Sequence, residues 1–153
     1  MLFKAVVFDA YGTLFNVNAI QALAETIFPG QGAAIATLWR DKQIEYTRLI
    51  TQSDPHNPQG SQYYLPFREI TKRALEFTLK RLKLAYVIND INRLMMLYDE
   101  LTAFPENLAV LQKIKNTGLI TAILSNGSPD MLASAVHSAG MTGYIDHVIS
   151  VDR

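Results

Sequence analysis

The segment AVVFDAYGTLF, residues 5–15, constrains the fold of this chain more than any other stretch. Its four apolar residues, Ala5–Phe8, run without interruption up to Asp9. A short unbroken apolar run is typical of a parallel-sheet strand that is buried on both faces. Ligands of open parallel sheets bind outside the carboxyl ends of the strands, so Asp9 is predicted to lie where α/β proteins carry out chemistry. The simpler alternative is an aspartate that caps a helix or a turn.

The apolar periodicity along the rest of the chain predicts helices first and then a return to alternating strands and helices. Four helices are expected at residues 20–27, 31–51, 67–81 and 88–98, followed by a helix that ends near Gly118, a strand at 119–124, a helix from Pro129 to Gly140 and a strand at 144–151. This order predicts an α/β fold with a Rossmann-like parallel-sheet core. Residues 1–14 and 101–153 would form the core, and residues 15–100 a helical cap inserted after the first strand.

The composition excludes several classes of function. With 153 residues and 49% hydrophobic content, the chain is of one-domain length and can bury a core. Fourteen basic and fourteen acidic residues cancel, which argues against a nucleic-acid partner or an anionic membrane. The absence of cysteine excludes disulfides and thiol catalysis. No stretch is apolar enough for a membrane span, so we expect a cytoplasmic protein.

A second group of polar residues follows the predicted strand at 119–124. Ser125 and Asn126 come directly after it, and Gly127 and Ser128 lead into the helix that starts at Pro129. Neighbouring parallel strands end at the same edge of a sheet, so this turn is expected near Asp9, where its amides could receive an anion. The alternative is an ordinary connecting turn, since Ser, Asn and Gly are common in α/β loops.

The string DAYGTL at residues 9–14 resembles the first signature of the haloacid dehalogenase superfamily, whose aspartate is the attacking nucleophile. Most phosphatases of that superfamily carry a second aspartate two residues later, as a general acid beside a magnesium-binding carboxylate. This chain has Tyr11 at that position. A departing halide needs no proton, whereas phosphoryl transfer needs charge neutralisation and a general acid. The string is therefore more similar to the L-2-haloacid dehalogenase branch, which also carries its cap after the first strand.

This resemblance implies roles for six residues of the predicted core. Asp9 would be the nucleophile, Thr13 would orient its carboxylate, and four residues would contact the substrate: Ala10, Tyr11, Ser125 and Asn126.

Three residues of the predicted cap receive roles in the same way. Trp39-Arg40 followed by Gln-x-Glu-Tyr is similar to the family's cap helix, whose arginine faces the active site. Arg40 would hold the carboxylate or receive the halide, and Ile44 and Phe67 would form the apolar pocket wall. Ordinary alternatives stay open: an exposed ion pair for Arg40 and helix–helix core for the other two. Acidic Asp41 departs from the neutral amide expected after the arginine.

The reaction implied by the resemblance is hydrolysis of (S)-2-haloacids to (R)-2-hydroxyacids through an aspartyl ester, with no metal or other cofactor. The three histidines, His56, His137 and His147, show no metal-binding spacing. A 2-haloalkanoate is the expected partner, and a homodimer is compatible with the sequence.

The family pattern continues beyond the last predicted strand, first with a lysine that pairs with the nucleophile and then with a further strand. Lys4 lies at the wrong end of its strand to replace that lysine. With the C-terminal third of the pattern missing, we expect a shortened gene product, part of a longer protein, or a domain completed by another chain. Two alternative functions stay open: a magnesium-dependent phosphatase of the same superfamily and a non-catalytic remnant.

Overall fold

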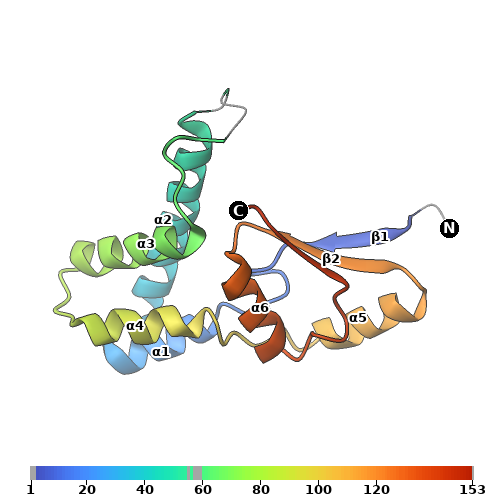
Figure 1. Cartoon of the computed structure of the whole chain (residues 1–153). Helices are drawn as coiled ribbons and strands as arrows, with labels where there is room; N and C mark the ends of the chain where they lie inside the picture. The colour runs from blue at the N-terminus through green and yellow to red at the C-terminus, as the bar shows by residue number, and fades with distance from the viewer. Residues whose placement is uncertain (1–2, 55, 57–59, 153) are drawn as a thin grey trace. The chain divides into compact units, whose positions relative to one another are not determined.

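The computed structural model describes residues 3–54, 56 and 60–152. The chain divides into two compact units, a sheet unit formed by Met1–Ala19 and Met96–Arg153, and a helical unit formed by Ile20–Met95 (Figure 1). The α/β class and the helical insertion after the first strand, both predicted from the sequence, are confirmed. Among the described residues, no helix combines the length and apolarity of a membrane span.

The sheet unit is built on three parallel strands in the order β1-β2-β3. They are β1 (Ala5–Phe8), β2 (Ile120–Ser125) and β3 (His147–Ser150). The helices α5 (Asn107–Asn116) and α6 (Pro129–Ser138) connect the strands and lie on the same side of the sheet in Figure 1. Phe8 pairs with Ile123, and Ser125 pairs with Ser150. This register brings the carboxyl ends of all three strands to one edge.

The two faces of the sheet differ in burial. Thr121, Ile123 and Ser125 are buried on the face that α5 and α6 cover. The opposite face carries apolar side chains that remain exposed: Val7 (57%), Ile120 (45%), Leu124 (50%) and Ile149 (49%). The predicted burial of the first strand on both faces is therefore wrong: Ala5 and Val7 are exposed, and β1 lies at the edge of the sheet, where it pairs with β2 alone among the described residues.

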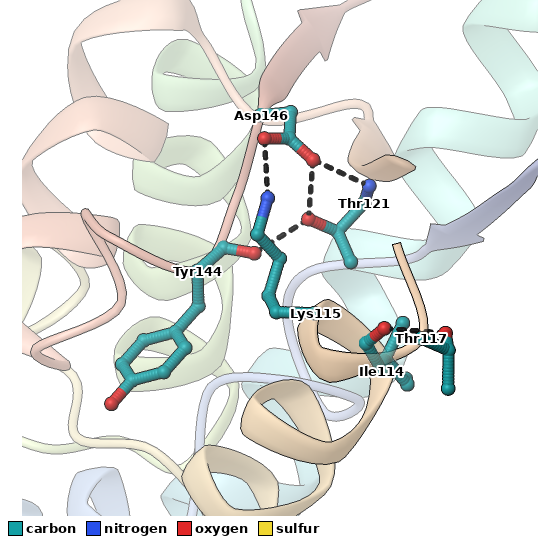
Figure 2. Close-up of polar contacts among 6 residues, drawn as sticks. All are labelled: Ile114, Lys115, Thr117, Thr121, Tyr144 and Asp146. Carbon is teal, nitrogen blue, oxygen red and sulfur yellow. Dashed lines mark hydrogen bonds and ion pairs between the residues drawn. The ribbon is translucent and has the colours of Figure 1, made fainter. Parts of the chain in front are cut away.

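The third strand begins at His147, later than the predicted residue 144, because the residues before it bind side chains of β2 and α5. The Asp146 carboxylate accepts from Lys115 Nζ (2.5 Å) and from Thr121 N (2.8 Å), while Thr121 Oγ1 donates to Tyr144 O (2.5 Å), as Figure 2 shows. The Lys115 ammonium and the Thr121 amide lower the pKa of Asp146 to about 2. These contacts hold residues 144–146 in a turn.

The helical unit contains α1 (Ala19–Ile27), α2 (Gly32–Gln52), α3 (Phe67–Arg81) and α4 (Ile88–Leu97). The helices α2 and α3 pack side by side through apolar side chains such as Ile35 and Leu75, which are fully buried. The indole of Trp39 donates across this interface to Thr71 O (2.8 Å). A buried tryptophan usually finds such a partner, and here it fixes the register of the two helices.

The turn between α1 and α2 is closed by the carboxylate of Glu25. It accepts from Gly30 N (2.6 Å) and Gly32 N (2.8 Å), and these backbone donors lower its pKa. Gly30 has a φ of +77°, a conformation that L side chains rarely adopt. A Cβ at Gly32 would lie 2.6 Å from Gln21 O, so this helix start also needs glycine.

Candidate active site

Asp9 follows β1 directly and is exposed to solvent. The turn after it is built on Ala10 O, which accepts from Leu14 N (2.8 Å) and Phe15 N (3.0 Å). Gly12 has a φ of +90° in this turn, which explains the glycine at that position. Thr13 Oγ1 faces Asp9 Oδ2 at 3.4 Å, which is longer than the usual O–H···O hydrogen bond. The turn thus presents the Asp9 carboxylate with one hydroxyl beside it.

Tyr11 points into the core of the sheet unit. Its side chain is 3% exposed, and its ring lies against the rings of Phe15 (centroids 5.8 Å apart) and Tyr98 (5.6 Å). The neighbouring Ala10 is fully buried. The position where the superfamily's phosphatases carry their second aspartate is therefore part of an aromatic cluster in this chain. Within the described residues, no group of three His, Asp or Glu side chains is placed to hold a metal ion.

The turn after β2 adjoins the Asp9 turn, as the sequence predicted. Ser125 is buried, and its hydroxyl accepts from Gly127 N (3.2 Å), while Asn126 is exposed. Gly127 lies so close to Tyr11 that a Cβ would come within 2.9 Å of the ring atom Cε2. Ser150 of β3 donates to Gly127 O (2.6 Å) and fixes the turn from the other side. The predicted residues of the sheet unit therefore gather at one edge of the sheet.

Two polar residues at this edge received no role from the sequence. Ser128 is 6% exposed and occupies the N-cap position of α6 without capping it, and its hydroxyl has no hydrogen-bond partner among the described residues. A serine before a helix-starting proline is a recognisable pattern that could have drawn attention to it. Asn107 donates from Nδ2 to Thr13 O and Leu14 O, both at 3.0 Å. No local sequence pattern identifies this anchor, because it bonds a turn more than ninety residues away.

The three predicted residues of the helical unit lie on two helices, with Arg40 and Ile44 one turn apart on α2 and Phe67 at the start of α3. Arg40 is half-buried on α2 and donates to Gln43 Oε1 (2.7 Å), while Phe67 is buried at the start of α3. Ile44 lines a surface hollow of about 410 Å³ together with Asp41, Glu45, Arg48 and Leu49. Arg40 and Phe67 are linked through Gln43 and Thr71, two buried residues that the sequence did not single out.

Comparisons with known proteins agree with the resemblance seen in the sequence. Residues 3–153 match the model of the haloacid dehalogenase-like hydrolase family. The (S)-2-haloacid dehalogenase H-109 of Pseudomonas putida is 38% identical over 149 residues, 97% of this chain and 63% of that protein. A crystal structure of an L-2-haloacid dehalogenase is 49% identical, with a TM-score of 0.92 over 98% of this chain and 64% of that one.

A third comparison concerns a structure that contains a covalently bound acid. The L-2-haloacid dehalogenase of Xanthobacter autotrophicus with chloropropionic acid covalently bound is 39% identical, with a TM-score of 0.87, over 99% of this chain and 58% of that one. The chain thus spans about three fifths of the length of the curated relatives it matches.

Proposed function

The chain belongs to the haloacid dehalogenase-like hydrolases, and we propose that it carries the nucleophile and the carboxylate-binding turn of an enzyme that hydrolyses (S)-2-haloacids to (R)-2-hydroxyacids. The observation that carries this proposal is the contrast at the end of β1, where Asp9 is exposed while Tyr11 is buried in an aromatic cluster. A carboxylate nucleophile without a neighbouring general acid suits displacement of a halide, which leaves without a proton.

In the first step, a carboxylate oxygen of Asp9 attacks carbon 2 of the substrate from the side opposite the halogen. The new carbon–oxygen bond forms as the carbon–halogen bond breaks, so the carbon inverts and the halide leaves with the bonding electrons. Ser125 and Asn126 hold the substrate carboxylate in this proposal, with Ala10 and Tyr11 lining the same end of the pocket. The buried Ser125 hydroxyl and the start of α6 are suited to an anion.

In the second step, water attacks the carbonyl carbon of the Asp9 ester. The bond between that carbon and the ester oxygen, which Asp9 supplied in the first step, breaks. This releases the (R)-2-hydroxyacid, regenerates the carboxylate with an oxygen from water and gives one proton to solvent. Thr13 orients the Asp9 side chain, as the carboxylate in the first step and as the ester in the second, through the contact seen at 3.4 Å, which can tighten when substrate binds.

Arg40 supplies fixed positive charge for the departing halide or the substrate carboxylate, and Ile44 and Phe67 surround the carbon chain. The proposal includes a cytoplasmic enzyme that forms a homodimer. The given sequence contains no cysteine, which is compatible with a reducing compartment. Sedimentation of the purified protein tests the dimer.

Halide release from (S)-2-chloropropionate, without added metal, tests the proposed function. The measurement uses the full protein that the gene encodes, with the 153-residue chain alongside. Asp9→Asn is expected to lower kcat by at least about 10³-fold, since it removes the attacking group. Asp90→Asn is the matched control, because Asp90 accepts only from a backbone amide at the start of α4, Val87 N, in the described structure.

Two results would contradict the proposal. Halide release that survives Asp9→Asn would show that another group attacks the substrate. A folded protein that releases no halide but hydrolyses a phosphate monoester with magnesium, in an Asp9-dependent way, would indicate the phosphatase alternative.

A further inference from the structure

Two fully buried polar side chains link Arg40 to the neighbouring helix. Gln43 on α2 and Thr71 on α3 are both 0% exposed. Arg40 NH1 donates to Gln43 Oε1 (2.7 Å), Gln43 Nε2 donates to Thr71 Oγ1 (2.7 Å), and Thr71 Oγ1 donates to Phe67 O (2.7 Å). All four residues lie within the helical unit. The guanidinium is therefore connected, through two side chains, to the backbone at the first residue of α3.

The donor and acceptor chemistry of these groups fixes the direction of each hydrogen bond from Arg40 to Phe67. A guanidinium can only donate, so Gln43 must turn its oxygen toward Arg40 and its amide nitrogen toward Thr71. Thr71 must then accept with its oxygen, which leaves its single proton for Phe67 O. A flipped Gln43 amide would bring two donors together at Arg40. Only one arrangement satisfies all the groups, so these hydrogen bonds hold Gln43 Oε1 at a fixed place on α2.

We infer that Gln43 and Thr71 are positioning residues that set the orientation of the Arg40 guanidinium for substrate. The inference rests on the proposed function, in which Arg40 meets the substrate carboxylate or the departing halide. Arginine recognises such groups through a planar fork of donors, so a rotation of the fork matters more than it would for a point charge. Gln43, one turn along α2 and held by Thr71 of α3, accepts from one donor of the fork and thereby restricts the directions in which the other donors can face.

The competing explanation is that the bonded side chains merely hold α2 against α3. The structure separates these two roles, because Trp39 Nε1 makes its own bond across the interface to Thr71 O, a backbone atom. Replacing the Thr71 side chain leaves that bond and the apolar packing intact. A buried polar network in which every group is hydrogen-bonded also fixes the orientation of its side chains. Removing one member therefore disturbs that orientation in addition to lowering stability.

The test compares variants that remove different hydrogen bonds between Arg40 and Thr71. Thr71→Val removes the acceptor for Gln43, Gln43→Met removes the acceptor for Arg40, and Thr71→Ser restores the hydroxyl. Thr78→Val is the matched control: Thr78 is also 0% exposed on α3 and donates to a backbone carbonyl one turn earlier, Ala74 O (2.8 Å), but it makes no bond to α2 among the described contacts.

We expect Thr71→Val and Gln43→Met to lower kcat/KM for (S)-2-chloropropionate about 10-fold, because a misplaced charge stabilises the reacting groups poorly. Thr71→Ser is expected to recover most of that loss, and Thr78→Val to lose little. In the background of Arg40→Ala, Gln43→Met should cause no further loss, since its effect passes through the arginine. An equal loss with and without Arg40 would overturn the inference.

A second readout does not depend on turnover. In NMR spectra of the folded protein, slow rotation of the Arg40 guanidinium would give separate Nη resonances, and these should merge in Thr71→Val and Gln43→Met but persist in Thr78→Val. Unchanged rotation in the first two variants would overturn the inference. Altered rotation in a protein that turns over no haloacid would instead overturn the proposed function and leave the positioning of the guanidinium established.

Discussion

At the scale of single residues, the contact between Tyr11 and Gly127 joins the two halves of the candidate active site. The Tyr11 ring fills the space where a side chain at position 127 would lie, so the glycine is required by packing and not by its φ. The same tyrosine belongs to the turn that presents Asp9. A side chain at position 127 should therefore displace the Tyr11 ring and, with it, the turn that carries Asp9.

We predict that Gly127→Ala destabilises the protein by about 1–3 kcal/mol, as overpacking of a close-packed core usually does. The new Cβ would lie 2.8 Å from Leu132 Cδ2 and 2.9 Å from Tyr11 Cε2, which forces one of them to move. Urea denaturation measures the change in the free energy of unfolding. Gly143→Ala is the control, since a Cβ there meets nothing within 4 Å and should alter stability little. Equal stability of the two variants would show that the ring yields freely.

At the scale of elements, the entry to β3 depends on a carboxylate that is shared between α5 and β2. Asp146 receives Lys115 from the end of α5 and the Thr121 amide from β2, so one side chain ties three elements together (Figure 2). Its pKa is lowered to about 2 from an ordinary 3.8. A carboxylate with a depressed pKa in the folded state stabilises the fold only while it is ionised.

We therefore predict that Asp146→Asn lowers the free energy of unfolding at neutral pH. The difference in free energy of unfolding between variant and parent should narrow as the pH falls from about 4 to about 2. The sign follows because the unfolded chain binds the proton first, at the higher pKa, and the advantage of the parent is lost on acidification. Denaturation at a series of pH values measures the gap. Glu69→Gln is the control, because Glu69 pairs with Arg73 in an exposed position on α3 and should contribute little. A gap that stays constant with pH would contradict the prediction.

The turn between α1 and α2 offers an independent test of the same physics in the helical unit. Glu25→Gln should lower the thermal stability at neutral pH, because an amide oxygen is a weaker acceptor than a carboxylate for Gly30 N and Gly32 N. The two backbone donors lower the pKa of Glu25, so its contribution should also decline as the pH falls below the ordinary value of 4.5. Circular dichroism during heating measures the effect. Glu45→Gln removes an ion pair with Lys42 within α2 and is expected to change the thermal stability less than Glu25→Gln does.

At the scale of the whole molecule, the sequence predicted the order of elements better than their environment. The bounds of α3 agree with the expected helix at 67–81, and Asp9 and Ser125 lie at strand ends as predicted. Local periodicity carries this information, because a helix or a strand repeats its apolar residues at its own spacing. The position of Gln43 could not be found in that way: a polar residue on a helix usually indicates the solvent side, and its partner Thr71 lies 28 residues away.

The exposure of β1 was mispredicted for a related reason. An apolar strand shows that its side chains tolerate burial, but the number of covered faces depends on which helices pack on the sheet. In the sheet unit, α5 and α6 lie on one side, and Val7, Leu124 and Ile149 remain exposed on the other. Within the described residues, β1 also pairs with β2 alone.

An unpaired strand edge beside an exposed apolar face promotes association between molecules. We predict that the 153-residue chain associates as its concentration rises and binds a dye specific for apolar surface. Val7→Lys combined with Ile149→Lys should reduce both effects, because each places a charge on the exposed face of the sheet. Sedimentation velocity and dye fluorescence measure the two effects.

Leu49→Lys is the control for that prediction, since Leu49 is 54% exposed, much as Val7 is (57%), but lies on α2 in the helical unit. If the sheet face drives association, this variant should sediment as the parent does. If Leu49→Lys reduced association as much as the double variant does, the associating surface would lie on the helical unit instead. There Leu49 lines an apolar pocket of about 590 Å³ together with Tyr46 and Tyr63. A parent chain that stays monomeric at every concentration would show that the exposed strand face is too small or too twisted to pair with a second copy.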